Sequence, residues 1–262
     1  MMKIATWNVN SIRTRAEQVT DWLQENPVEV LCLQETKVVD KDFPKSPFED
    51  LGYQLSISGQ KAYNGVAILT RSPLEDVSTG FAPIIGDDAT ELDAQKRVIS
   101  GRIGNIRVVD LYIPNGSSVG SEKYEYKLKW LDALQNYLKT ILDKEKKICI
   151  CGDFNIAPED RDIYQPKTGQ AHIMASDAER QALRAIANLG FFDAFRKFTD
   201  DGGYFSWWDY RRQGFQRNRG WRIDHHFLTK PLYDRAVACT IDINPRRQTK
   251  PSDHAPVILE IS

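Results

Sequence analysis

The chain has 262 residues, of which 41% are hydrophobic and 27% are charged, values typical of a globular protein. A chain of this length buries enough surface to fold without a disulfide or a metal. Its 35 basic and 36 acidic side chains leave a formal net charge of −1, which excludes a strongly basic protein that coats nucleic acid. Any site for a polyanion must therefore be a local patch on a near-neutral body.

The N-terminal stretch MMKIATWNVNSIRTR lacks the hydrophobic core of a signal peptide, and no apolar run approaches the ~18 residues of a membrane span. We therefore expect a soluble, cytoplasmic monomer with no membrane partner. The cysteines form no CxxC pair, and three of them fall in apolar runs. We expect reduced thiols packed in the core, rather than zinc ligands or disulfides, at Cys32, Cys149, Cys151 and Cys239.

Short strands and amphipathic helices alternate along the chain. The run 3–9 predicts a strand, and the capping-box spacing of Thr14 and Glu17 predicts a helix that ends at Pro27. The run 28–35 is apolar enough to be a strand buried on both faces. Further strands are predicted over 53–58, 64–71, 97–103 and 106–114.

The second half of the chain continues this order. Apolar residues every three or four positions predict a long helix over 121–143, and KKICICGDFN (146–155) predicts a strand that ends in polar residues. Ser176 and Glu179 begin another helix, which Gly190 ends. Three strands follow, over 221–229, 235–243 and 255–261. No linker or strict repeat interrupts the chain, which predicts a single domain over residues 1–262.

Two of these strands end in a similar way. The strand KIATW is followed by Asn8 and Asn10, and the strand KICICG is followed by Asp153 and Asn155. Side chains two residues apart point to the same side of an extended chain. Because α/β sheets build sites at the carboxyl ends of their strands, these pairs are candidate site residues.

The remaining polar residues that cap or interrupt apolar strands are Glu35, Tyr112, Asn115, Asp224, Asp253 and His254. Such residues are usually turn formers, but Asp224 lies inside an apolar strand, where an unpaired acid costs several kcal/mol. The set is rich in oxygen ligands, with one imidazole and no cysteine, which suits Mg²⁺ or Mn²⁺ better than Zn²⁺. Such a combination favours phosphodiester cleavage.

The stretch 204–222, YFSWWDYRRQGFQRNRGWR, combines arginines with aromatic side chains. The arginines, among them Arg217 and Arg219, would neutralise phosphates, and the aromatic rings would stack on a nucleotide or shape a pocket for a sugar. The alternative is a core aromatic cluster with solvated arginines on a turn.

Seven segments occur together in a characteristic order: TWNVNSIR, LCLQETK, YIPNG, CGDFNIAP, FSWWDYR, NRGWRID and PSDHAP. In this order and spacing the chain resembles the exonuclease III family of DNA-repair nucleases, within the DNase I-like endonuclease/exonuclease/phosphatase superfamily. The resemblance implies a four-layer α/β sandwich, in which two mixed β-sheets pack face to face with helices outside. It also implies a phosphodiesterase that uses Mg²⁺, or Mn²⁺, and acts on duplex DNA with abasic sites, nicks or 3′ ends.

The resemblance also implies roles, motif by motif. Glu35 in LQET is the expected principal metal ligand, with Asn8 beside it and Asp253 near the metal region. Asp153 in GDFN is expected to orient or deprotonate the attacking water, helped by Asn155.

The same motif match assigns the phosphate contacts. Tyr112 and Asn115 in YIPN are expected to contact the scissile phosphate, and His254 to bind and stabilise it. Neighbouring residues of an extended chain point to opposite sides, so Asp253 is badly placed to orient the imidazole of His254. The family pattern gives His254 a remote partner, Asp224. We expect this pair to keep the imidazole protonated.

Substrate contacts are expected from Asn10 and from the tryptophans that would wall a pocket for an extruded sugar, which are Trp207, Trp208 and Trp221. His225 and His226 follow Asp224 where the family usually has apolar or aromatic residues. Alternation along the strand sends the two histidines to opposite faces, so we expect structural roles for both.

His172 lies in a loop in which family members vary. It is either a solvated loop residue or a pocket residue whose imidazole narrows the space for a flipped abasic sugar, which would favour trimming of 3′ ends over internal incision. Two other functions stay open: a phosphodiesterase of lipids or small molecules, and a non-catalytic nucleic-acid-binding regulator on the same fold.

Overall fold

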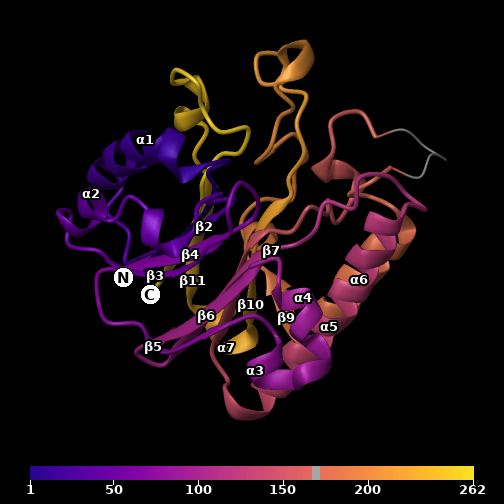
Figure 1. The fold of residues 1–262 in the computed structure, drawn as a ribbon. Coiled ribbons are helices and arrows are strands. Elements are labelled where there is room, and N and C mark those ends of the chain that lie inside the picture. Colours follow the sequence, from indigo (N-terminus) through magenta and orange to yellow (C-terminus); the bar gives the residue numbers. More distant parts are fainter. Residues whose placement is uncertain (167–171) are drawn as a thin grey trace.

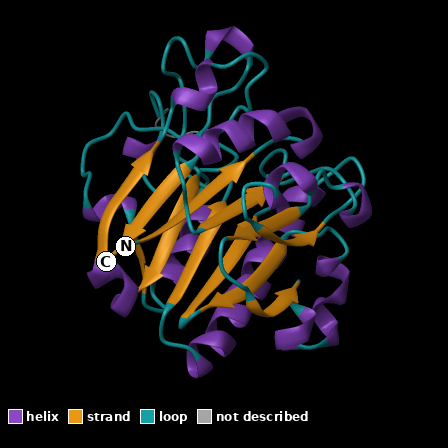
Figure 2. Cartoon of the chain, turned by 90° about the vertical axis from the view of Figure 1, so that its left-hand side faces the viewer, coloured by secondary structure: helices purple, strands orange, loops and turns teal. Residues whose placement is uncertain are grey.

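The computed structural model describes residues 1–166 and 172–262. Within these residues, two six-stranded sheets pack face to face between layers of helices (Figure 1, Figure 2). The first sheet has the order β11-β12-β1-β2-β4-β3, built from β1 Met2–Asn8, β2 Val30–Gln34, β3 Gln54–Ser58, β4 Val66–Thr70, β11 Ala236–Ile241 and β12 Val257–Ile261. The second has the order β5-β6-β7-β8-β10-β9, built from β5 Glu75–Thr79, β6 Val98–Ile103, β7 Ile106–Tyr112, β8 Ile148–Asp153, β9 Phe191–Asp193 and β10 Asp224–Thr229.

The helices cover the outer faces of the two sheets (Figure 1). The first sheet is covered by α1 Ile12–Glu25 and α2 Ser46–Glu49, and the second mainly by α3 Ala82–Ile85, α4 Thr90–Asp93, α5 Glu122–Lys144 and α6 Asp177–Ala187. A short helix, α7 Lys230–Arg235, follows β10, and single 3₁₀ turns span Asp40–Asp42, Asp87–Ala89, Asp160–Asp162, Phe195–Lys197, Arg211–Gln213 and Asn244–Arg247. In the described part of the chain, no helix has both the length and the apolar character needed to cross a bilayer.

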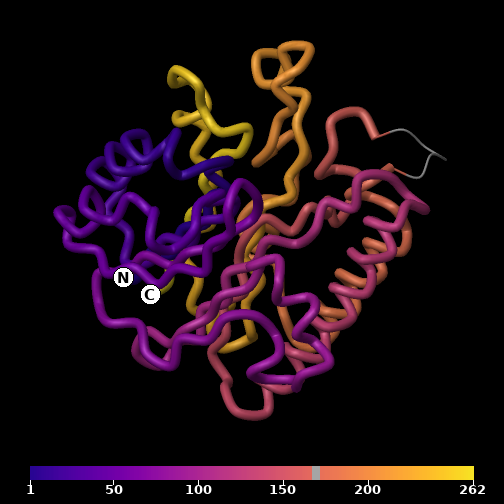
Figure 3. The backbone as a smooth tube through the Cα atoms, viewed as in Figure 1, coloured from indigo at the N-terminus to yellow at the C-terminus, as the bar shows by residue number. Residues whose placement is uncertain are grey.

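Strand alternation produces the layers. Along β1, Ile4 faces the other sheet, while Ala5 and Trp7 face the helices. Along β8, Cys149 and Cys151 face the other sheet, and Ile148 and Ile150 face α5. The buried apolar side chains therefore form three layers, one between the two β-sheets and one between each β-sheet and its helices. This arrangement confirms the predicted four-layer sandwich. The chain termini lie side by side (Figure 3), because β1 and β12 pair antiparallel.

The parallel pairs bring strand ends together. β1 runs parallel to β2, and β7 runs parallel to β8, with Tyr112 opposite Asp153. β10 runs antiparallel to β8, which places the first residue of β10, Asp224, opposite Asp153. The polar residues that follow these strands therefore meet at one edge of the sandwich.

The predicted helix caps have different outcomes. Ser176 and Glu179 form the capping box expected for α6. The first helix, in contrast, begins at Ile12, and the expected Thr14–Glu17 capping box is wrong. Its first amide groups are satisfied by another segment, because the backbone N–H groups of Ser11 and Ile12 donate to the carbonyls of Glu35 and Thr36.

Candidate active site

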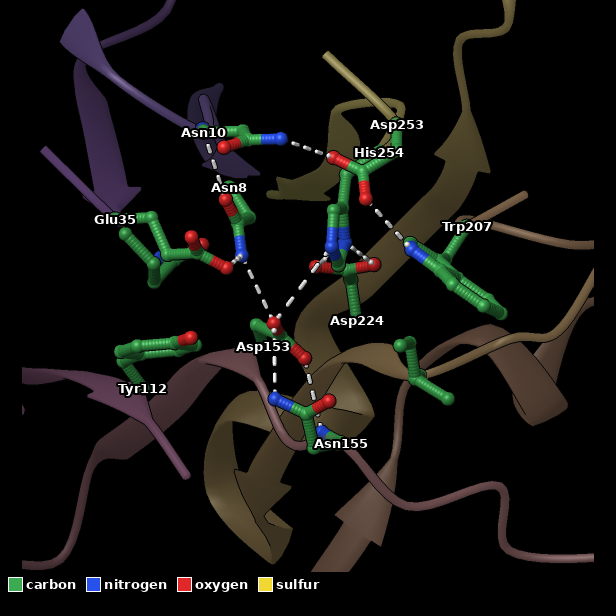
Figure 4. A network of polar contacts seen from close by, with 12 residues as sticks. Asn8, Asn10, Glu35, Tyr112, Asp153, Asn155, Trp207, Asp224, Asp253 and His254 are labelled. Carbon is green, nitrogen blue, oxygen red and sulfur yellow. Dashed lines mark hydrogen bonds and ion pairs between the residues drawn. The ribbon is translucent and has the colours of Figure 1, made fainter. Parts of the chain in front are cut away.

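Carboxylates and carboxamides from four strand ends meet in one network (Figure 4). The side-chain amide of Asn8, at the end of β1, donates to Glu35 Oε1 at 2.9 Å and to Asp153 Oδ2 at 2.9 Å. Tyr112, at the end of β7, lies beside the same network, and its phenol feels the negative charge of Glu35. The amide of Asn8 thus joins the two sheets at the site and links the predicted metal ligand Glu35 to the predicted catalytic residue Asp153.

The NVN and DFN segments fold alike. The backbone N–H of Asn10 donates to Asn8 Oδ1 at 3.0 Å, and that of Asn155 donates to Asp153 Oδ1 at 2.9 Å. Asn10 and Asn155 have φ values of 44° and 48°, and Glu35 has a φ of 52°. Left-handed backbone at a glutamate is strained, and such strain concentrates at functional sites.

Asn155 connects Asp153 to a further predicted residue. Its Nδ2 donates to Asp153 Oδ2 at 3.2 Å and to the carbonyl of Ile113 at 3.0 Å, while its Oδ1 accepts from Asn115 Nδ2 at 2.9 Å. The carboxylate of Asp153 is therefore held on one side by Asn155 and on the other by Asn8.

His254 is paired with Asp224, and Asp253 is not its partner. Nδ1 of His254 lies 2.9 Å from Asp224 Oδ2 and 3.1 Å from Oδ1, and its Nε2 lies 3.7 Å from Asp153 Oδ2. Burial alone lowers the pKa of His254, but the carboxylates of Asp224 and Asp153 outweigh it and raise the pKa to about 10. The imidazole is therefore positively charged at neutral pH.

The pKa of Asp153 is raised to about 7, mainly because the carboxyl is buried. The positive charge of His254 offsets part of this effect, while the charges of Asp224 and Glu35 add to it. A carboxyl that titrates near neutrality can accept a proton at physiological pH, as a general base requires.

The carboxylates of Glu35 and Asp153 could hold a cation, with the charged imidazole of His254 beside them. Ligand atoms of Glu35, Asp153 and His254 lie within 4.8 Å of one another. Burial favours the neutral form of Glu35, but Lys37, whose Nζ lies 2.7 Å from Oε2, and Asn8 outweigh burial and lower the pKa. Ionised carboxylates with carboxamides nearby suit Mg²⁺, so the donor set fits the predicted ion.

Asp253 lies outside this group. Its Oδ1 accepts from Asn10 Nδ2 at 2.9 Å, and its Oδ2 accepts from Trp207 Nε1 at 3.0 Å. The structure thus does not gather Asp253 with the candidate ligands of the metal. It holds Asn10 and Trp207 in place beside them.

The three predicted wall tryptophans have different positions. Trp207 and Trp221 are half-buried and form an antiparallel bridge, and the His172 ring lies 6.4 Å from the Trp221 ring, edge to face. Trp208 is only 2% exposed and its Nε1 donates to Asn218. The expected wall position of Trp208 is wrong, because alternation turns its side chain into the hydrophobic cluster under the loop.

The predicted arginines lie apart from the network. Arg217 and Arg219 are exposed on the loop that projects beyond the sheets (orange, top of Figure 1), next to the loop of residues 244–250. The guanidinium of Arg219 lies over the ring of Tyr164 at 5.8 Å. These side chains are placed for contact with an extended ligand and not with the reacting group.

Three residues that support the network were not predicted. Ser206 Oγ donates to Asp224 Oδ2 at 2.6 Å, and Arg97 stacks over the Tyr112 ring at 4.5 Å. Lys127 is fully buried and donates to the carbonyls of Asn115 and Asn155. A signal existed for Lys127, because it lies three residues after Tyr124 on the apolar face of the predicted helix.

A surface pocket of about 660 Å³ adjoins the site. Its lining includes Tyr112 and Asn115 from the network, with Arg97, Asn64 and Tyr126 around them. The pocket thus presents amides, phenols and a guanidinium next to the buried carboxylates, a surface that suits a phosphate-bearing ligand.

The profile of the Endonuclease/Exonuclease/phosphatase family matches residues 5–254. Exodeoxyribonuclease III of Haemophilus influenzae is 36% identical over 273 aligned residues, which cover 99% of both chains. An AP endonuclease from Archaeoglobus fulgidus is 41% identical with a TM-score of 0.93. The 3′ phosphatase NExo from Neisseria, solved with a product DNA hairpin, is 38% identical with a TM-score of 0.95. Both structures are covered in full, as is this chain.

Proposed function

Because the chain belongs to the endonuclease/exonuclease/phosphatase family and is an enzyme of the nuclease kind, we propose that it hydrolyses phosphodiester bonds of duplex DNA at abasic sites and 3′ ends, with Mg²⁺ as its cofactor. One observation carries this proposal. Ligand atoms of three side chains lie within 4.8 Å of one another at one edge of the sandwich. They belong to the charged imidazole of His254, to the carboxyl of Asp153, whose pKa is about 7, and to the ionised carboxylate of Glu35. This arrangement supports a proton acceptor and a positive charge that act side by side.

Each residue has a distinct task. Glu35, with Asn8 beside it, would hold the Mg²⁺, which offsets phosphate and leaving-oxygen charge when bound. Asp153 accepts the proton of the attacking water. Because Nδ1 of His254 is occupied by Asp224, Nε2 is the atom that presents positive charge to the phosphate.

Neutral donors complete the phosphate site. Burial, and then the charge of Glu35, raises the pKa of Tyr112 well above its usual value, so the phenol stays a hydrogen-bond donor. Asn115 lies on the same pocket wall. Trp207, Trp221 and His172 would bound the space for the terminal or extruded sugar.

Three duplexes test this function, each with Mg²⁺: one with an internal abasic site, one with a recessed 3′ end, and one with a nick that carries a 3′-phosphate. We expect cleavage of at least one and loss of all cleavage in Glu35→Ala. The matched control is Glu49→Ala, an exposed acid of α2, which should leave the rates unchanged. Hydrolysis of lipid or small-molecule phosphodiesters to monoesters, with all three duplexes left intact, would contradict the proposal.

A further inference from the structure

A second polar layer lies directly beneath the active site, between the two sheets. Side chains on one face of a strand recur every two residues. Cys151 therefore lies on the same face of β8 as Asp153, two residues earlier in the chain. His226 lies on the same face of β10 as Asp224, two residues later in the chain. The two strands pair Cys151 with His226, and neither side chain is exposed to solvent.

This layer contains thiols and an imidazole close together. Sγ of Cys149, Sγ of Cys151 and a ring nitrogen of His226 lie within 4.8 Å of one another. Cys32, on β2 in the facing sheet, is buried in the same core near Cys151, although it lies outside this group of three. Thiolates with one imidazole are the ligand set of tetrahedral structural zinc sites.

The imidazole of His226 has no protein partner of its own. Neither ring nitrogen makes a hydrogen bond to any residue in the described part of the chain, although the carbonyl of Ile4 lies near the ring. The adjacent His225 contrasts with it, because its nitrogens lie 3.1 Å from Arg222 and 2.9 Å from the carbonyl of Ile156. Burying a polar group without a partner is destabilising, so a ligand for His226 is favoured.

We propose that Cys149, Cys151 and His226 bind Zn²⁺, with Cys32 as the fourth ligand, at a structural site that joins the two sheets beneath the active site. Each coordinating thiol releases a proton as its sulfur binds, so two of the three thiolates balance the charge of the ion and the third leaves the site with one net negative charge. His226 binds as the neutral imidazole. The site differs from the Glu35 group both in place and in ligand chemistry, sulfur against oxygen.

Zinc content and zinc X-ray absorption of the whole protein test this proposal. The protein is purified with reductant and a histidine-free tag. We expect stoichiometric zinc, with sulfur scatterers at ~2.3 Å and nitrogen at ~2.0–2.1 Å. Two outcomes would overturn it: zinc surrounded only by oxygen and nitrogen, or zinc-free protein in which added Co²⁺ gives no thiolate-to-cobalt charge-transfer band.

Variants then assign the ligands. Cys149→Ser and His226→Leu should lower bound zinc to background, whereas Glu35→Ala should keep it. Cys239→Ser is the matched control, because Cys239 lies in the same inter-sheet core outside the group. Equal zinc loss in Cys239→Ser would count against the assignment. If Cys149→Ser does not fold, the absorption spectrum of the unmodified protein decides the question.

Discussion

At the scale of single residues, the charge of His254 depends on a carboxylate that lies 30 positions earlier in the chain. The pKa of His254 is raised to about 10, so the imidazole is charged below that pH and loses its charge as pH rises through it. Asp224→Asn removes the nearest negative charge and leaves burial, which lowers the pKa. We expect kcat to fall by roughly 10²-fold and the alkaline limb of the pH–rate profile to move to lower pH.

Steady-state rates over a range of pH measure both effects. Ser206→Ala is the matched control, since it removes a hydrogen bond to Asp224 but keeps the charge. Its alkaline limb should move less than that of Asp224→Asn. An unchanged kcat and profile in Asp224→Asn would show that the pairing does not support catalysis.

His172 is the second residue whose role can be isolated. Its ring packs edge to face against Trp221, and it is only half exposed. If the imidazole of His172 narrows the pocket for an extruded sugar, His172→Gly should widen that pocket. We then expect the ratio of abasic incision to 3′-end trimming to rise by about 10-fold or more. The two rates are measured on one preparation, and His172→Gln, which keeps a planar polar group, should shift the ratio less. An equal ratio in all three proteins excludes this role.

At the scale of elements, apolar patterns predicted the buried strands and the long helices. They did not predict a strand at the edge of a sheet whose side chains are polar and exposed. The strands β1 and β8 and the Ser176 cap of α6 were correct predictions. The strand β5, Glu75–Thr79, was missed, because it is an edge strand with mostly exposed side chains and has no apolar pattern. Local patterns also missed the true start of α1, because its amides are capped by residues of the β2–α2 segment.

The helix α5 is tied to the site through Lys127. Its ammonium group bonds to Glu179 and to the carbonyls of Asn115 and Asn155 in a fully buried position. Lys127→Met leaves the buried Glu179 carboxylate without its opposite charge, so we expect a loss of about 3–5 kcal/mol in the free energy of unfolding. We also expect a lower kcat, because the Asn115 and Asn155 backbone loses its tether.

Urea unfolding and steady-state kinetics separate these two effects. Adding Glu179→Gln to Lys127→Met removes the uncompensated charge and should restore part of the stability but not the kcat. Lys129→Met, an exposed lysine of the same helix, should change neither. Full recovery of kcat in the double variant would mean that Lys127 acts only through stability.

At the scale of the whole molecule, motif order predicted the family and named residues that the fold brings together, but not how the fold holds them. Asp153 and Asp224 are 71 positions apart, yet they pair across neighbouring strands β8 and β10. That neighbour relation follows from the order of strands in the sheet, which no local pattern contains. For the same reason, nothing in the sequence indicated that Cys151 and His226 lie next to each other. The sequence also assigned Trp208 the same pocket role as its neighbour Trp207.

The distribution of charge over the whole molecule leads to the last prediction. A body of net charge −1 gives DNA little general attraction, so affinity should depend on a few basic side chains that reach phosphates. Arg217 and Arg219 project on an exposed loop at the site end of the molecule (Figure 1), whereas Lys230 in α7 lies at the opposite end. Each phosphate contact contributes about 0.9 to the slope of log affinity against log salt concentration.

Arg217→Ala and Arg219→Ala should therefore each weaken duplex binding and reduce that slope by about 1, while Lys230→Ala should leave it unchanged. Binding is measured by fluorescence anisotropy in the Glu35→Ala background, so that the duplex is not cleaved. Because phosphate contacts carry no base information, the loss should be equal for duplexes of different sequence. Equal slopes for all four proteins would place the DNA elsewhere on the surface, away from this loop.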